Sequence, residues 1–236
     1  MDLLNKGDFS QRQVALITGV SIVAMAILAG LVVGMAMSEN LSLTDPDALL
    51  QHLQSQTGKF RWGIAGWIAI LICDLLAAWG LHIVYKEKAP KLSLITAWFR
   101  LSYATILGVA ISLLVMALWV STDGASLLSQ LDQGEMTLLM VKGFEGTWSW
   151  GLVIFGLHLI GLGVLVFQRN VILRIISILL LVSGIGYLIT NLGQLLLPNY
   201  AAYEATLETI FMLPMILGEV GLAVWLLVKG GKEWKK

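Results

Sequence analysis

The chain has 236 residues, of which 58% are hydrophobic and only 13% are charged. A soluble domain usually has about a quarter of its residues charged, so this composition excludes an ordinary soluble domain and indicates a membrane protein. Basic and acidic residues balance to a net charge of +0, and no basic face suggests a nucleic-acid partner.

Six apolar segments follow one another along the chain, each with roughly the 20 residues that cross a hydrocarbon core about 30 Å thick. The apolar run of the first segment is about 23 residues long, which exceeds the 7–15 of a secretory signal, so we expect an uncleaved helix. We therefore predict an all-α helical bundle in a single integral-membrane domain, 1–236. Its six transmembrane helices are expected at 14–37, 60–85, 92–120, 147–168, 171–196 and 206–228.

Basic residues predict how the helices are oriented. They precede the first segment, fill the turns after the second and fourth, and follow the sixth; they include Lys6, Arg12, Lys86, Lys88, Lys91, Arg169, Arg174, Lys229, Lys232, Lys235 and Lys236. Cytoplasmic loops carry an excess of lysine and arginine. We therefore expect both termini in the cytoplasm and a multi-pass protein of the bacterial cytoplasmic (inner) membrane.

The two longer outer connections have the pattern of short helices. In TDPDALLQHLQSQTG, Thr44 or Asp45 can cap a helix, Pro46 suits its first turn, and Gly58 can end it. SLLSQLDQGEMTLLMVKGF alternates apolar and polar residues in a similar way. Both are predicted to lie along the outer membrane surface. They would serve either as a lid that packs on the bundle or as a gate for a substrate.

Small residues inside the segments predict close approach between helices, since a glycine lets two backbones come together. The positions are Gly30 and Gly34 in the first segment, Gly184 and Gly186 in the fifth, and Gly218 and Gly221 in the sixth. Pro214 lies inside the sixth segment, which we expect to be kinked there.

Four ionisable residues interrupt the apolar segments: Asp74, Arg100, His158 and Glu219. A charged group at mid-bilayer costs about 2.5–3.5 kcal/mol or more, so we expect all four to face the protein interior. Counting 1.5 Å per residue from the nearest cytoplasmic basic residue puts them roughly 13–18 Å deep, within about one helical turn of each other. Tyr187, at roughly 20 Å by the same count, is a further candidate.

This layer predicts Asp74 as the counter-ion of Arg100 and Glu219 as the carboxyl group that holds a proton. It suits either a structural ionic network that orients four helices or a ligand or proton site, and both alternatives stay open. Asp74, His158 and Glu219 are acceptable metal ligands. Arg100 beside them would repel a cation, so we expect no metal. A b-type haem between His82 and His158 would need the two rings at the same depth, whereas they are expected well apart, so we expect no cofactor.

The chain lacks the sequence motifs that would name a reaction. It contains no G-x-S-x-G, no H-E-x-x-H and no P-loop. We therefore favour a binding module for a small amphiphile or lipid headgroup, or an accessory subunit, with membrane lipids, a membrane protein or a second copy as partners. A small transporter or proton-conducting protein that uses Glu219 and His158 as relays is the alternative. An intramembrane enzyme, which would need a nucleophile, ranks third.

From about residue 60 to the C-terminus the chain contains, in order, FRWGIAGWIAILICDLLAAWGLHIVYK, AWFRLSYATILG, FGLHLIGLGVLVFQR, GIGYLI, LLPNY and GEVGLAVWLLVKG. In order and spacing these stretches resemble a bacterial and archaeal family catalogued only as domain of unknown function 4386 (DUF4386). The resemblance implies a six-span membrane protein but no activity. It draws attention to Arg61, Asp74, Arg100, His158, Pro198 and Glu219.

Overall fold

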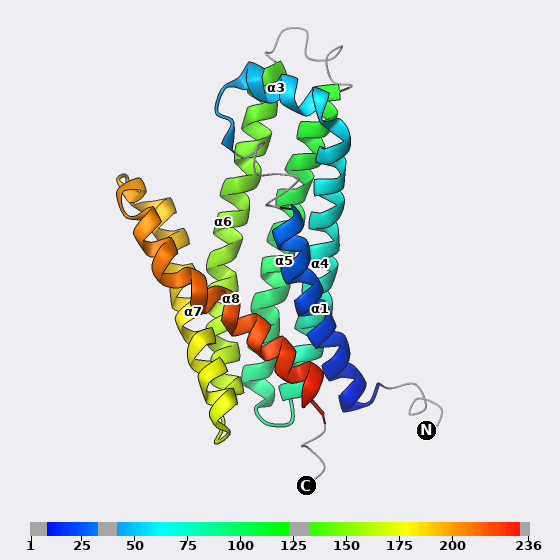
Figure 1. The fold of residues 1–236 in the computed structure, drawn as a ribbon, viewed down its shortest axis with the longest axis vertical. Coiled ribbons are helices and arrows are strands. Elements are labelled where there is room, and N and C mark those ends of the chain that lie inside the picture. Colours follow the sequence, from blue (N-terminus) through cyan, green and yellow to red (C-terminus); the bar gives the residue numbers. More distant parts are fainter. Residues whose placement is uncertain (1–8, 33–41, 123–132, 232–236) are drawn as a thin grey trace. The chain divides into compact units, whose positions relative to one another are not determined.

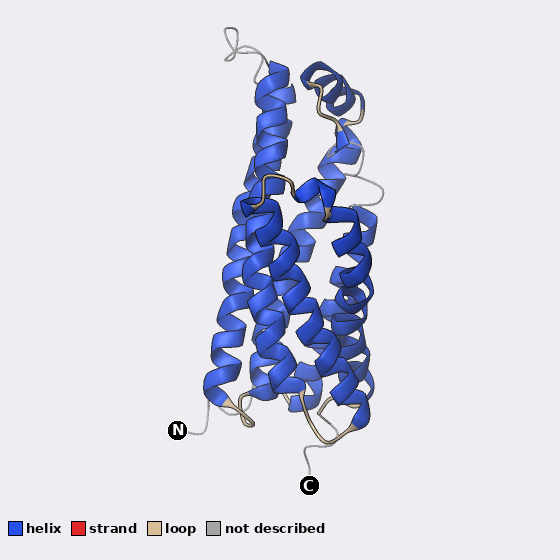
Figure 2. Cartoon of the chain, turned by 90° about the vertical axis from the view of Figure 1, so that its left-hand side faces the viewer, coloured by secondary structure: helices blue, strands red, loops and turns tan. Residues whose placement is uncertain are grey.

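A computed structural model describes residues 9–32, 42–122 and 133–231, and within these ranges the chain is helical and contains no strand (Figure 2). Six of the helices are long and apolar enough to cross a membrane, which confirms the predicted all-α, six-span fold. They are α1 (Gln11–Leu31), α4 (Thr57–Tyr85), α5 (Pro90–Thr122), α6 (Gln133–Val166), α7 (Val171–Leu196) and α8 (Glu204–Val228) (Figure 1). Shorter elements are α3 (Pro46–Ser55) and the 3-10 turn η3 (Tyr200–Ala202).

The predicted helix ends agree best at α7 and least at α6. The fifth span was expected at 171–196, and α7 has these bounds. The fourth was expected from residue 147, but α6 begins at Gln133. No proline interrupts 133–147, so the helix continues through the segment that was predicted as a separate short helix. That prediction is wrong from Gln133 onward, and its residues 126–132 lie outside the described residues.

The first predicted outer helix is present as α3. The Asp45 side chain caps it by accepting a hydrogen bond from the Ala48 amide at 2.8 Å, and Pro46 is its first residue. The predicted end at Gly58 is wrong, because α3 ends at Ser55 and Gly58 lies inside α4. Glycine is tolerated in that first turn of α4 because the helix is long and its later turns are packed.

The chain divides into two compact units. Unit 1 consists of Met1–Ala24, Cys73–Leu101 and Val153–Lys236, and it contains α7, α8 and parts of α1, α4, α5 and α6. Unit 2 consists of Met25–Ile72 and Ser102–Leu152, and it contains α3 and the remaining parts of the same four helices.

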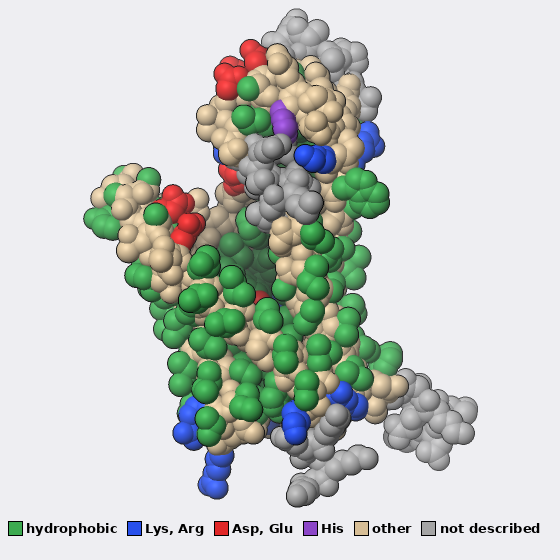
Figure 3. Space-filling model, viewed as in Figure 1, with side chains coloured by type: hydrophobic (Ala, Val, Ile, Leu, Met, Phe, Trp, Pro, Cys, Tyr) green, Lys and Arg blue, Asp and Glu red, His purple; other side chains and the backbone are tan. Residues whose placement is uncertain are grey.

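In unit 1 the start of α1 meets the end of α8. The Arg12 guanidinium donates hydrogen bonds to the carbonyl oxygens of Leu226 (3.0 Å), Leu227 (2.5 Å) and Gly230 (2.8 Å). These carbonyls lie at the C-terminal end of α8, and a cation is favourable at the negative end of a helix. Six spans return the chain to the side where it started, and Figure 3 shows Lys and Arg side chains at this end of unit 1. That this side is cytoplasmic stays a prediction.

The predicted close helix crossings are present at Gly184, Gly186 and Gly218, and those predicted at Gly30 and Gly221 are not. A Cβ atom added to Gly218 would lie 3.1 Å from the Ser183 hydroxyl oxygen, whereas one added to Gly221 would have its nearest neighbour at 3.5 Å, an ordinary contact. A Cβ atom added to Gly184 of α7 would lie 2.6 Å from the Gly156 carbonyl oxygen of α6. One added to Gly186 would lie 2.6 Å from a phenyl ring of α8. The prediction for Gly30 is wrong, since a Cβ there would meet no atom of the described chain within 4 Å. Gly34 lies outside the described residues.

The core of unit 2 is built from aromatic side chains. Trp67 of α4 is only 2% exposed, and its ring contacts those of Phe144 and Trp148 of α6 edge-on, at centroid distances of 5.2 and 5.0 Å. Gln54 of α3 donates a hydrogen bond to the Ser121 carbonyl oxygen at the end of α5 (3.0 Å). These contacts hold α3 and the adjoining turns of α4, α5 and α6 together.

Candidate functional site

Arg100 of α5 is the centre of a buried group of polar side chains in unit 1. Its Nε atom donates a hydrogen bond to Asp74 Oδ1 of α4 at 3.0 Å, and its Nη2 atom lies 2.8 Å from the same oxygen. Both side chains are 0% exposed. The ion pair expected from the sequence is therefore present, and both of its members are removed from solvent and lipid.

Glu219 of α8 joins the same guanidinium from another side. Arg100 Nη1 donates a hydrogen bond to Glu219 Oε1 at 2.9 Å. The Glu219 side chain is 14% exposed, whereas those of Asp74 and Arg100 are 0% exposed. Glu219 is thus the carboxyl group through which an outside molecule can reach the group of charges.

His158 of α6 completes the group, and its partners determine its protonation. Its Nδ1 atom lies 2.9 Å from the Thr96 carbonyl oxygen, which can only accept, so Nδ1 carries the hydrogen. Its Nε2 atom lies 3.1 Å from Arg100 Nη1, which can only donate, so Nε2 is the acceptor. One ring nitrogen therefore carries a hydrogen and the other does not, so the imidazole is neutral. We call Asp74, Arg100, His158 and Glu219 the polar cluster.

The polar cluster carries more acid than base. One guanidinium faces two carboxyl groups, and the neutral imidazole adds no charge, so two ionised carboxylates leave one negative charge in excess. Asp74 Oδ2 is buried and has no hydrogen-bond partner in the described part of the chain. A buried, unpaired acceptor costs about 1–3 kcal/mol, and more when it is charged. The polar cluster can therefore take up one further proton, cation or hydrogen-bond donor.

The close approach of α5 and α6 places His158 in the polar cluster. Gly161, three residues after His158 and so on the same side of α6, packs where a Cβ atom would collide with the Thr96 hydroxyl. Because residue 161 is glycine and has no Cβ atom, the backbones of α5 and α6 come close enough for the His158 ring to reach the Thr96 carbonyl oxygen. This pairing to a backbone atom had no signal in the sequence.

Phe155 is a neighbour of the polar cluster that the sequence did not single out. The Arg100 guanidinium lies 5.2 Å from the centre of its ring, within cation–π distance. The same ring stacks on His158 at 5.6 Å and meets Tyr187 edge-on at 5.4 Å. Tyr187 therefore adjoins the polar cluster through Phe155. The one sequence signal for Phe155 is that it lies three residues before His158, which places both side chains on the same face of α6.

Arg61, the remaining candidate, is not among these contacts. It belongs to unit 2, where it is exposed on α4. Within the described residues, no group of three or more His, Cys, Asp or Glu side chains has the arrangement of a metal site. The geometry instead suits binding of a cation or a hydrogen-bond donor by carboxylate oxygens.

All four residues of the polar cluster lie in the part of the chain that matches a protein-family model. A family model described as "Domain of unknown function (DUF4386)" matches residues 17–230. An uncharacterized protein of Archaeoglobus fulgidus is 28% identical over 171 residues, which are 72% of this chain and 85% of the archaeal protein. No solved structure matches the chain. Neither description names an activity.

Proposed function

The chain belongs to the DUF4386 family, whose description gives no activity, and we propose its function from the polar cluster. It is a multi-pass protein of the cytoplasmic membrane that binds a small amphiphile whose polar end is a cation or a hydrogen-bond donor. The observation that carries this proposal is the presence of two carboxyl groups beside the single guanidinium of Arg100, together with the unpaired oxygen of Asp74. An amphiphile reaches such a site from the bilayer, where its tail is already dissolved.

Glu219 is the contact point for the polar end of the ligand. Its side chain is 14% exposed, and only its Oε1 atom is bound by Arg100 in the contacts described above. An ammonium group beside Glu219 would neutralise the surplus charge of the polar cluster. Hydrogen bonds between ions are about twice as strong as neutral ones, and the low dielectric of the interior strengthens them further.

Binding of a long-chain alkylamine to the purified protein in nanodiscs tests this proposal. A long-chain alcohol with the same tail separates the effect of charge from that of the apolar tail. We expect the amine to bind more tightly than the alcohol. Glu219→Gln should weaken amine binding about 10- to 100-fold, because a charge-assisted hydrogen bond contributes about 1.5–3 kcal/mol. The alcohol should be little affected.

Glu208→Gln is the matched control, since it removes an exposed acidic residue from the same helix without touching the polar cluster. It should leave both affinities unchanged. Equal binding of amine and alcohol, or amine binding that Glu219→Gln does not alter, would contradict the proposal.

A proton-conducting or proton-coupled transport function is the second candidate. The surplus charge of the polar cluster can equally be neutralised by a proton, and Glu219 is the exposed carboxyl group that would exchange it. Pro214 interrupts α8 within two turns of Glu219, where a helix bends most readily. Proton flux into liposomes tests this candidate, and flux that is the same for the natural chain and for Glu219→Gln would remove it.

A further inference from the structure

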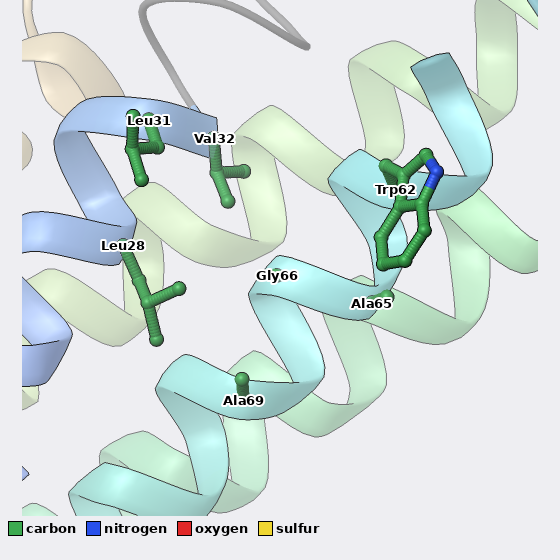
Figure 4. Close-up of a pocket in the computed structure, with 7 residues that line it drawn as sticks. All are labelled: Leu28, Leu31, Val32, Trp62, Ala65, Gly66 and Ala69. Atoms are coloured by element: carbon green, nitrogen blue, oxygen red, sulfur yellow. The ribbon is translucent and has the colours of Figure 1, made fainter. Parts of the chain in front are cut away.

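Unit 2 contains an apolar groove between α1 and α4 (Figure 4), and none of the residues that line it belongs to the polar cluster. Its volume is about 380 Å³. Leu28 and Leu31 of α1, with Val32 directly after this helix, line one side. Trp62 and the small residues at 65, 66 and 69 of α4 line the other.

Small side chains on α4 create the groove. Positions 62, 65, 66 and 69 recur at the three- and four-residue spacing of one helix face. Beyond Trp62 they carry only Ala, Gly and Ala, so that face is hollow opposite the leucines of α1. At Gly66, α4 touches the residue that follows α1, since a Cβ atom there would collide with the Val32 side chain. The groove is therefore a fixed gap beside a close contact.

Basic residues lie at one end of the groove. Lys59 is three residues before Trp62 and seven before Gly66, so it lies on the groove face of α4. Lys59 and Arg61 are both exposed, and the first turn of α4 contains no acidic residue. Figure 3 shows basic side chains at the first turns of α4 and hydrophobic ones beyond them.

Trp62 lies between the basic and the apolar parts and is 79% exposed. Tryptophan is enriched at the level of lipid headgroups because its ring is apolar and its N–H group is polar. From Trp62 to Ala69 the groove extends about 10 Å along α4, roughly a third of a hydrocarbon core. The order basic, amphipathic, apolar matches the order phosphate, glycerol, acyl chain in a phospholipid.

We propose that the groove binds one acyl chain of an anionic phospholipid, whose headgroup is held by Lys59 and Arg61. The charge at the end of the groove selects an anionic lipid over a zwitterionic one, since each basic side chain near an anionic headgroup contributes about 1 kcal/mol. This lipid site is independent of the amphiphile proposed for the polar cluster, because it uses other residues and the opposite charge.

Native mass spectrometry of the full-length protein, with equal amounts of phosphatidylglycerol and phosphatidylcholine of identical acyl chains, tests the proposal. We expect phosphatidylglycerol to be retained preferentially. Lys59→Gln and Arg61→Gln should each lower the phosphatidylglycerol-to-phosphatidylcholine ratio about fivefold. Lys142→Gln, which removes a half-exposed cation of α6 in the same unit, should leave the ratio unchanged.

Filling the groove tests its apolar part separately. Ala69→Leu should lower retention of both lipids, whereas Ala26→Leu, at an exposed position of α1 outside the groove, should not. Equal retention of the two lipids by the natural chain, or retention unchanged by Ala69→Leu, would overturn the proposal. A dimer that Ala69→Leu dissociates, with no lipid retained, would show that a second copy covers the groove and would overturn it as well.

Discussion

Replacing Arg100 should damage the protein more than replacing either of its acidic partners. Arg100→Leu removes the only cation of the polar cluster and leaves Asp74 and Glu219 facing each other without it. Asp74→Leu instead leaves one guanidinium and one carboxylate, whose charges balance. Both substitutions break the Asp74–Arg100 ion pair, and Arg100→Leu additionally removes the contacts of the guanidinium with Glu219 and His158.

The magnitudes follow from burial. Breaking a buried pair so that an uncompensated charge remains costs about 3–5 kcal/mol, which we expect for Arg100→Leu. Asp74→Leu loses hydrogen bonds to a charged group and should cost about 1.5–3 kcal/mol. Both values are upper estimates, because polar groups in a membrane also find partners in the unfolded state. At about 2–4 °C per kcal/mol, Arg100→Leu should lower the Tm by roughly 6–20 °C.

Thermal unfolding in nanodiscs, followed by the helical circular dichroism signal, measures these losses. The double variant Asp74→Leu with Arg100→Leu should lose less than the sum of the two single variants by about 1–3 kcal/mol, because the two residues touch. Lys142→Leu is a control that removes the cation of a half-exposed ion pair with Glu145 and should cost less than about 1 kcal/mol. Equal losses for Asp74→Leu and Arg100→Leu, or losses that add strictly, would refute the reasoning.

Three further substitutions test the packing and the charges of unit 1. Gly184→Leu should lower the stability by about 1–3 kcal/mol or more, because its Cβ would meet the Gly156 backbone. Gly221→Ala should be tolerated, because the atom nearest to its Cβ would lie at 3.5 Å. The Tm values of the two variants test this difference. Arg12→Gln should speed hydrogen exchange of the last amides of α8, since its guanidinium binds three carbonyl oxygens there, and an unchanged exchange rate would argue against that role. Glu219→Gln should cost less than about 1 kcal/mol, since a glutamine oxygen still accepts from the guanidinium; a Tm as low as that of Arg100→Leu would show that the Glu219 charge is essential to the fold.

The fold could be predicted because hydrophobicity alone sets it. Each span is an apolar run of sufficient length, and the bilayer permits few structures besides helices. The helix ends were harder to predict where a helix extends beyond the apolar run. α6 starts well before its apolar run because no proline lies in 133–147. Gly58 does not end α3 because the next helix begins one residue earlier, at Thr57.

The polar cluster could be anticipated in part. Depth counting along helices grouped four ionisable residues, since charged side chains are rare in spans and must find each other. It could not give the hydrogen bond from His158 to the Thr96 backbone or the contact of Phe155 with Arg100, because neither a carbonyl oxygen nor one more phenylalanine stands out in an apolar sequence. Arg61 was selected through the family resemblance, and it lies in unit 2.

The most direct test of ligand binding at the polar cluster is a cryo-electron microscopy map of the protein in nanodiscs. We predict density for a bound molecule in contact with the exposed side of the Glu219 carboxyl group, and the same map of Glu219→Gln without it. A polar cluster sealed by protein side chains, with no density beside Glu219 in the natural chain, would contradict a binding function and leave an ionic network that only orients the helices.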